Sequence, residues 1–166
     1  ANCISLTNIR IPDTVSYIGD GAFSQCETLS NIVIPNRVTE INSYTFNGCK
    51  SLKNVTISEN VTYIAEYAFY CCETLPSVNI PGNVKEVGEN AFYGCFELKN
   101  VIISNGVQAL RNYSFAFCDS LAQIIIPKSV ITLEAQTFFE GNPNLTVYCE
   151  AQSQPSGWDD GWVNEV

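Results

Sequence analysis

Apolar residues recur along this chain at fixed positions, with a 23-residue period. Leucine, isoleucine and valine each keep one position through six copies, and no insertion breaks the register from Cys3 to Gly141. The three columns are Leu6, Leu29, Leu52, Leu75, Leu98 and Leu121; Ile11, Ile34, Ile57, Ile80, Ile103 and Ile126; and Val15, Val38, Val61, Val84, Val107 and Val130. Such self-similarity at a fixed period predicts a stack of coils, one coil for each copy.

Phenylalanine and cysteine form two further columns with the same period. They are Phe23, Phe46, Phe69, Phe92, Phe115 and Phe138, and Cys3, Cys26, Cys49, Cys72, Cys95 and Cys118. Neighbouring coils joined by strand pairing lie about 4.8 Å apart, so like residues lie over one another and bury a continuous core. We therefore expect the phenylalanines to supply bulk, and the small, seldom exposed cysteines to fill a tight turn.

A period of this length, with Leu and Ile at set offsets, is typical of a leucine-rich-repeat solenoid. Within one copy, the alternating, β-branched segment 32–34 predicts a strand, and the segment 38–41 predicts a second, shorter one. The segment SYTFNGC (43–49) suggests a short helical turn. The predicted fold is mainly β with short helical turns, a right-handed superhelix of six to seven 23-residue coils over residues 1–149, followed by a C-terminal cap or tail over 150–166.

The pattern C-x-x-L-x-x-I-x-I-P-x-x-V-x-x-I-G-x-x-A-F is clearest in IPDTVSYIGDGAFSQCETL (11–29) and IPGNVKEVGENAFYGCFEL (80–98). Through it, residues 1 to about 150 resemble the BspA-like class of leucine-rich repeats. The resemblance implies a surface-exposed or secreted protein of a host-associated bacterium or a parasitic protist. It also implies adhesion and host-protein binding without catalysis, and further domains in a larger parent chain.

Composition narrows the classes of partner. The 166 residues carry 8 basic and 17 acidic side chains, a net charge of -9, which disfavours nucleic acids and anionic membranes. No apolar run approaches the length needed to span a bilayer, so we expect no membrane insertion. Histidine is absent, which removes the commonest general base and metal ligand, and we expect no catalytic residue and no cofactor. The absence of Met indicates a processed protein or a piece of a longer one.

The eight cysteines leave three alternatives open: disulfides, a metal site or reduced thiols. Stacked cysteines have parallel Cβ vectors, which disfavours bridging, and a straight column does not converge as metal ligands must. We therefore expect reduced, buried thiols and no metal. Two cysteines lie outside the column: Cys71 is the best candidate for an exposed, reactive thiol, and Cys149 falls in an isoleucine column and is expected to be buried.

The C-terminal segment EAQSQPSGWDDGWVNEV abandons the repeat. Its Trp158 and Trp162 are expected to fold over the last open coil, because terminal coils must be covered; the alternative is a ligand site. The adjacent Asp159 and Asp160 suggest a calcium or acid–base site, but neighbouring residues point apart and no third oxygen donor is evident.

Alternation places two columns on the solvent face of the predicted sheet. One is polar and consists of Asn8, Asn31, Asn54, Ser77, Asn100 and Gln123; the other varies and consists of Arg10, Val33, Thr56, Asn79, Ile102, Ile125 and Tyr148. The polar column is either a hydrogen-bonded ladder or part of a recognition surface, or both. The apolar end of the second column is either a contact site or a strip covered by the C-terminal tail.

These observations lead to two functional hypotheses. The first is a non-catalytic binding module at the cell surface or outside the cell, which recognises a protein or glycan, host extracellular matrix included, through the strand face. The second is a passive spacer within a larger surface protein. Tyr44, Tyr67 and Tyr113 form another column, which we expect to cover the phenylalanines rather than to make protein contacts.

Overall fold

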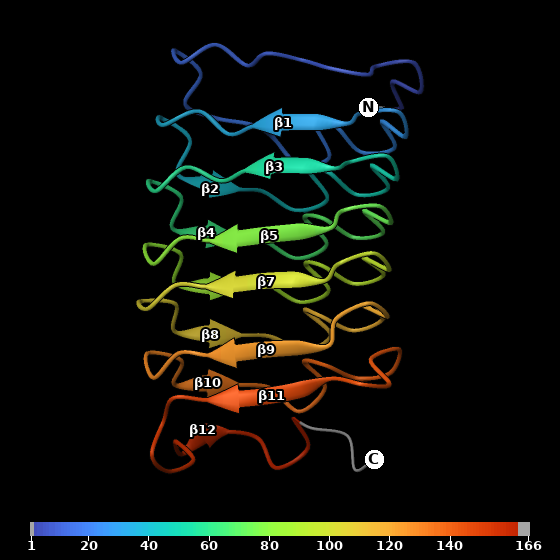
Figure 1. Cartoon of the computed structure of the whole chain (residues 1–166). Coiled ribbons are helices and arrows are strands. Elements are labelled where there is room, and N and C mark those ends of the chain that lie inside the picture. The colour runs from blue at the N-terminus through green and yellow to red at the C-terminus, as the bar shows by residue number, and fades with distance from the viewer. Residues whose placement is uncertain (1, 163–166) are drawn as a thin grey trace.

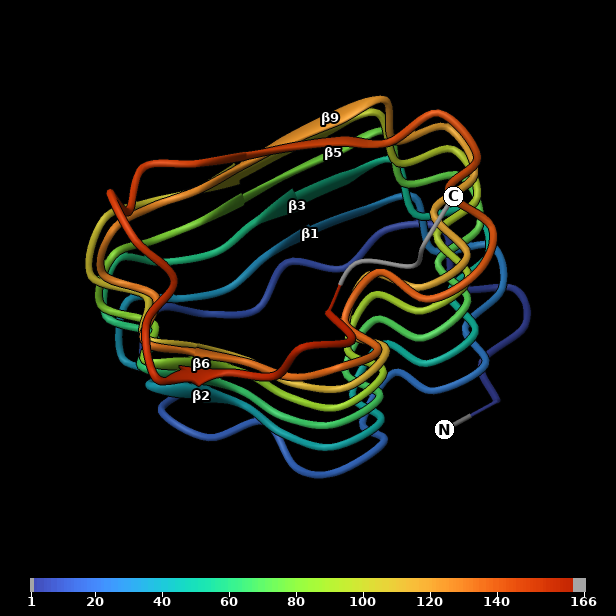
Figure 2. The same cartoon turned by 90° about the horizontal axis from the view of Figure 1, so that it is seen from below.

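The computed structural model describes residues 2–162, which form a β-solenoid with a parallel layer of short strands on each of two sides. We call one layer the strand face: β1 (Asn31–Val33), β3 (Asn54–Thr56), β5 (Ser77–Ile80), β7 (Asn100–Ile103), β9 (Gln123–Ile126) and β11 (Thr146–Cys149). The other layer, the back sheet, consists of β2 (Glu40–Ile41), β4 (Tyr63–Ile64), β6 (Glu86–Val87), β8 (Ala109–Leu110), β10 (Thr132–Leu133) and β12 (Gly157–Trp158). The coils lie one below another (Figure 1), and the two layers lie on opposite sides of the stack (Figure 2).

Strand pairing from β1 to β11 follows the period of the sequence. Asn31 pairs with Asn54, Ile64 with Val87, and Ser77 with Asn100, each with the residue one period further along the chain. The back sheet is continuous through six strands, whereas the strand face pairs as β1–β3, β5–β7 and β9–β11. The Lys53 N–H donates to the Ser30 carbonyl at the start of β3. Pro76 lies one period later and has no N–H, so the equivalent bond is missing, which accounts for the break before β5. The predicted β-solenoid of 23-residue coils is confirmed.

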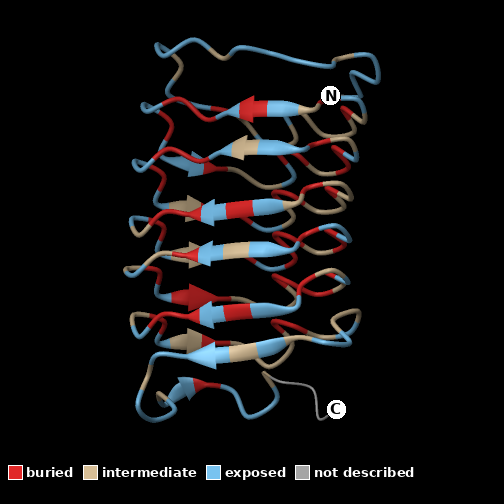
Figure 3. Cartoon of the chain, in the orientation of Figure 1, coloured by how far each residue is buried: buried red, intermediate tan, exposed pale blue. Residues whose placement is uncertain are grey.

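The aligned columns form the core between the two layers (Figure 3). Phe46, Phe69, Phe92 and Phe115 are fully buried, and successive rings of this column stack 5.0–5.4 Å apart. The cysteines Cys26, Cys49, Cys72, Cys95 and Cys118 are also fully buried. Phe23 lies at the end of its column, where Phe46 alone stacks on it, and is half-buried.

The segments expected to form helical turns take a different path. No helix occurs in residues 2–162, because alternate N–H groups of each turn donate to the next coil: Phe46 to Ala68 and Gly48 to Tyr70, both at 2.8 Å. The intervening Asn47 closes a turn within its own coil by donating to Tyr44 at 3.1 Å. A helix needs consecutive N–H groups to bond within one segment. Positive φ angles at Tyr44 (58°) and Gly48 (71°) also interrupt any right-handed helix.

After Cys149 the chain crosses to the back sheet, where β12 pairs with β10 and sets Trp158 beside Leu133 (Figure 1). Trp158 is buried, its indole N–H donates to the Val130 carbonyl at 3.1 Å, and Trp162 packs edge-on against it at 5.3 Å. The tail thus covers the apolar end of the last coil from Gly157 to Trp162. The rest of the proposed cap, 163–166, lies outside the described residues. Within the described part of the chain, no helix is long and apolar enough to cross a membrane.

Candidate binding surface on the strand face

The solvent side of the strand face carries the two columns that the alternation indicated. All of the candidate binding residues are exposed there: Asn8, Arg10, Asn31, Val33, Asn54, Thr56, Asn79, Asn100, Ile102, Ile125 and Tyr148. Their strand neighbours, such as Ile32 and Ile124, point into the core and are buried (Figure 3). Because the coils keep one spacing, the exposed side chains form a regular grid.

The polar column forms an amide ladder at its N-terminal end. The Asn31 side-chain amide donates to Asn8 Oδ1 at 3.0 Å, and the Asn54 amide donates to Asn31 Oδ1 at 2.7 Å. Ser77 has no amide to continue the ladder into the next coil. In this half of the strand face the polar column therefore stabilises coil stacking, and the Asn31 amide both donates and accepts within the ladder.

The C-terminal half of the strand face presents the apolar strip of Ile102, Ile125 and Tyr148, which are exposed to 61%, 55% and 54%. They line a shallow groove of about 540 Å³, together with Lys99, Asn100, Val101, Gln123 and Ile124. The tail runs to the back sheet and, as far as Trp162, leaves this strip uncovered. The alternative of an apolar strip buried under the tail is thus wrong for the described residues.

The strand face also differs in charge from the rest of the chain. None of the strands β1, β3, β5, β7, β9 and β11 contains Asp or Glu, although the chain has 17 such residues. These strands contain no Lys or Arg either, but the exposed Lys53 and Lys99 lie just before β3 and β7, and Arg10 lies in the first coil. The exposed Glu150 lies just after β11. The net charge of the whole chain conceals this distribution, which is visible when charge is counted column by column.

The cysteine column is held by hydrogen bonds as well as by packing. Each thiol from Cys49 to Cys118 donates to a phenylalanine carbonyl of the preceding coil at 3.2–3.4 Å: Cys49 to Phe23, Cys72 to Phe46, Cys95 to Phe69 and Cys118 to Phe92. All eight cysteines are free thiols. Burial raises the pKa of Cys49 to about 12, and it raises the pKa of Cys72 and Cys95 well above the usual value.

Two expectations about the other cysteines need correction. Cys149 is exposed, because β11 is the last strand of this layer and no further coil covers it. Cys71 is only half-buried, and burial and the nearby Glu73 raise its pKa, so it is a poorer nucleophile than expected. The exposed thiols are Cys3 and Cys149, one near each end of the stack.

The buried thiols make stability depend on pH. Their folded-state pKa lies above the unfolded value of 9.0. Their contribution to the free energy of unfolding is therefore complete below pH 9 and is lost as pH rises towards 12. We expect the free energy of unfolding to fall there by about 1.4 kcal/mol per pH unit for each such thiol. Replacing Cys72 by serine, which does not titrate there, should reduce the slope measured by urea unfolding between pH 9 and 11. An unchanged slope would contradict a buried, protonated thiol.

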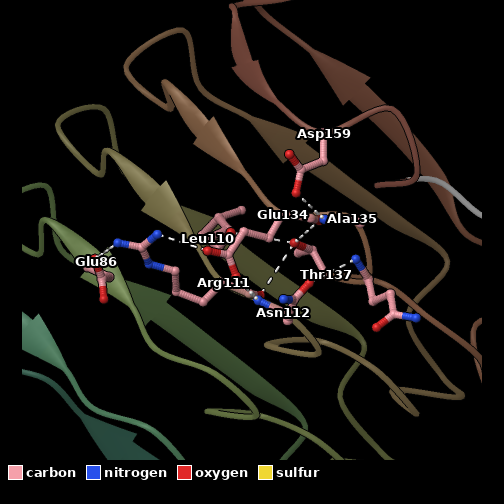
Figure 4. A network of polar contacts seen from close by, with 9 residues as sticks. Glu86, Leu110, Arg111, Asn112, Glu134, Ala135, Thr137 and Asp159 are labelled. Carbon is pink, nitrogen blue, oxygen red and sulfur yellow. Dashed lines mark hydrogen bonds and ion pairs between the residues drawn. The ribbon is translucent and has the colours of Figure 1, made fainter.

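The acidic residues near the C-terminus bind backbone amides (Figure 4). Asp159 Oδ2 accepts the Ala135 N–H at 3.1 Å, and Glu134 accepts the Asn112 N–H at 2.7 Å while pairing with Arg111 at 2.9 Å. Asp159 therefore caps an N–H of the last coil, and Asp160 is exposed beside it. No three His, Cys, Asp or Glu side chains gather as a metal site anywhere in residues 2–162.

Comparison with solved structures supports the same architecture. The chain is similar to a leucine-rich repeat protein from Bacteroides ovatus, with 31% identity over 90% of this chain and a TM-score of 0.82. It is also similar to the T. pallidum leucine-rich repeat protein TpLRR, with 25% identity over 87% of this chain and a TM-score of 0.80. The chain spans 38% of the first of these proteins and 70% of the second.

A search of curated proteins finds no significant match. The BspA type leucine-rich repeat region matches the chain in six copies, over residues 1–84 and 39–150. These two ranges together span nearly all of the solenoid. The chain belongs to the BspA type leucine-rich repeat family.

Proposed function

We propose that this solenoid is a non-catalytic binding module, part of a surface-exposed or secreted protein, which recognises a protein or glycan through its strand face. The observation that carries the proposal is the uncovered strip of Ile102, Ile125 and Tyr148 on a layer whose strands contain no carboxylate. Apolar groups grouped on a surface and rimmed by polar ones are typical of contact sites. Lys99, Asn100 and Gln123 supply that polar rim.

The charge distribution points to the chemistry of the partner. The strands of the strand face contain no carboxylate, and Lys53 and Lys99 lie just before β3 and β7, so this layer repels acidic glycans or acidic protein surfaces less than the chain as a whole, which carries a net charge of -9. The aromatic ring of Tyr148 and the aliphatic side chains of Ile102 and Ile125 offer contact area without a deep pocket. Host extracellular-matrix proteins and mucus glycoproteins are the first candidates.

The test is binding of the folded protein to immobilised matrix proteins and mucin. The double variant Ile102→Ser, Ile125→Ser should weaken binding about tenfold or more, because it removes the apolar centre of the contact. The matched control is Ile131→Ser, which changes an isoleucine of similar exposure (58%) beside the back sheet and should leave binding unchanged. Equal losses in both variants, with intact folding, would contradict a strand-face site.

The spacer hypothesis rests on a different observation, the continuous hydrogen bonding from coil to coil along the stack. A spacer has no partner and tolerates changes at Arg10, Asn79 and Ile102 without functional loss. Absence of binding to every matrix protein and mucin in the same assay would therefore favour the spacer over the binding module.

A further inference from the structure

The tyrosine column on the turn side of the solenoid is interrupted at one coil. The rings of Tyr44 and Tyr67 stack 4.7 Å apart with an interplanar angle of 4°. The next position along this column is Asn90 and the one after it is Tyr113. Two coil spacings amount to about 10 Å, so the positions of Tyr67 and Tyr113 in the stack lie far enough apart for one more ring between them.

The short side chain at Asn90 leaves this room open. Asn90 is buried, and its amide donates to Glu89 Oε1 at 3.2 Å instead of reaching into the column. The result is an open groove of about 370 Å³, which we call the aromatic slot. Its lining residues are Tyr67, Glu89, Asn90, Tyr93, Tyr113, Phe117, Phe139 and Glu140.

The neighbouring aromatic column closes one side of the slot. Tyr93 stacks on Tyr70 at 4.9 Å, and the ring of Phe117 lies tilted at 4.9 Å from Tyr93. At the far end, Phe139 packs edge-on against Tyr113 at 5.9 Å. The slot is therefore surrounded by aromatic rings that are held in place by their own stacking partners.

The charges around the slot are negative. Two exposed carboxylates, Glu89 and Glu140, line it, and none of its lining residues is Lys or Arg. Burial raises the pKa of Tyr67, and the nearby Glu89 raises it further. Burial also raises the pKa of Tyr93, with further contributions from Cys71 and Glu140. Aromatic faces and carboxylates both attract cations, so the two kinds of group favour the same ligand.

We propose that the aromatic slot binds the guanidinium group of an arginine side chain presented by a partner protein. Guanidinium is planar, stacks on aromatic faces and loses its hydration more readily than an ammonium group does, so it suits a gap the width of one ring. Its N–H groups can also bond carboxylates such as Glu89 or Glu140 in pairs. The site lies on the turn side and is independent of the strand face.

The proposal is tested by titrating the protein with the blocked peptide acetyl-Gly-Arg-Gly-amide while recording the NMR signals of the tyrosine rings. We expect saturable shifts at Tyr67 and Tyr113. The citrulline peptide keeps the planar shape without the charge, and the lysine peptide keeps the charge without the plane. Each should bind about tenfold more weakly than the arginine peptide.

Asn90→Tyr is the decisive variant, because it completes the column and fills the slot. The φ angle of Asn90 is 55°, which matches the values of 58°, 56° and 58° at Tyr44, Tyr67 and Tyr113. The backbone therefore accepts tyrosine at this position. We expect it to abolish binding while leaving the unfolding temperature equal to or above that of the wild type. Glu89→Gln, which leaves the aromatic column untouched, should weaken binding several-fold, and the remote control Glu59→Gln should not.

Several results would overturn the assignment. The first is a folded Asn90→Tyr protein that binds the arginine peptide as tightly as the wild type does. The second is a citrulline or lysine peptide that binds the wild type as tightly as the arginine peptide does. Failure of the arginine peptide to saturate the wild type at about 10 mM would also do so, because affinity that weak provides no recognition. If Asn90→Tyr does not fold, an unchanged affinity in Glu89→Gln overturns the proposal by itself.

Discussion

Replacing Phe69 by alanine lowers the free energy of unfolding by about 3–5 kcal/mol, the usual cost of truncating a fully buried phenylalanine. The loss has two sources. The ring is packed on both sides, against Phe46 at 5.2 Å and Phe92 at 5.0 Å, and the cavity left in mid-column cannot close without breaking the coil spacing. Urea unfolding followed by circular dichroism measures the change, and the melting temperature should fall by about 10 °C.

The matched control is Phe96→Ala, the same substitution at a side chain that is 40% exposed and lies outside the column. It should cost about 1 kcal/mol or less, because little apolar surface is lost from the core. If Phe69→Ala costs no more than Phe96→Ala, the phenylalanine column is not the core of this protein.

Trp158→Ala is expected to be nearly as damaging, at about 3–5 kcal/mol, but its effect should be confined to the C-terminal end. Trp158 is the buried anchor of the tail, and it pairs with Leu133 through β12. Without it the last coil loses its cover. In a solenoid each coil contacts only its neighbours, so unfolding should start at the uncovered end.

Amide hydrogen exchange distinguishes this local effect from a global one. In Trp158→Ala, protection should fall at Ala135 and Asp159, whose N–H groups depend on the tail contacts, and should persist at Gly48 and Phe69 in the middle of the stack. Asp160→Ala, at an exposed neighbouring position, serves as the control and should change neither region. A uniform loss of protection along the chain would contradict a terminal cap.

The architecture was predictable because the period dictates the register. When Leu, Ile, Phe and Cys each recur with the same 23-residue period, parallel pairing of like positions is the arrangement that buries all four columns together. The alternation around Ile32 likewise identified which side chains of the strand face are exposed. These properties depend on side-chain type and spacing, both of which are visible in one sequence.

The path of the turns was not predictable in the same way. The segment 43–49 offers its N–H groups either to its own coil or to the next one, and the two choices use the same residues. The structure divides them alternately, and the positive φ at Tyr44 and Gly48 decides against a helix. No spacing of apolar residues carries that information.

End effects account for the error at Cys149. A position in an apolar column predicts burial only when a coil lies on each side of it. The strand β11 has a neighbouring coil on one side only, where it pairs with β9. The aromatic slot, by contrast, was visible in the sequence: Asn90 stands in a column otherwise held by Tyr44, Tyr67 and Tyr113. Treating those tyrosines only as a cover for the phenylalanines hid the gap between them.

The fold depends on like residues stacking coil upon coil and leaving the strand face open. NMR measurement of proton–proton contacts between backbone atoms tests it most directly, because paired parallel strands lie about 4.8 Å apart. The structure predicts contacts between Asn31 and Asn54, Ile64 and Val87, and Ser77 and Asn100, always one period apart. The tail strand β12 pairs outside the period, 25 residues from its partner in β10 (Thr132 with Gly157). Among the repeat strands β1 to β11, contacts at any other spacing, or an antiparallel pattern, would contradict this stacking.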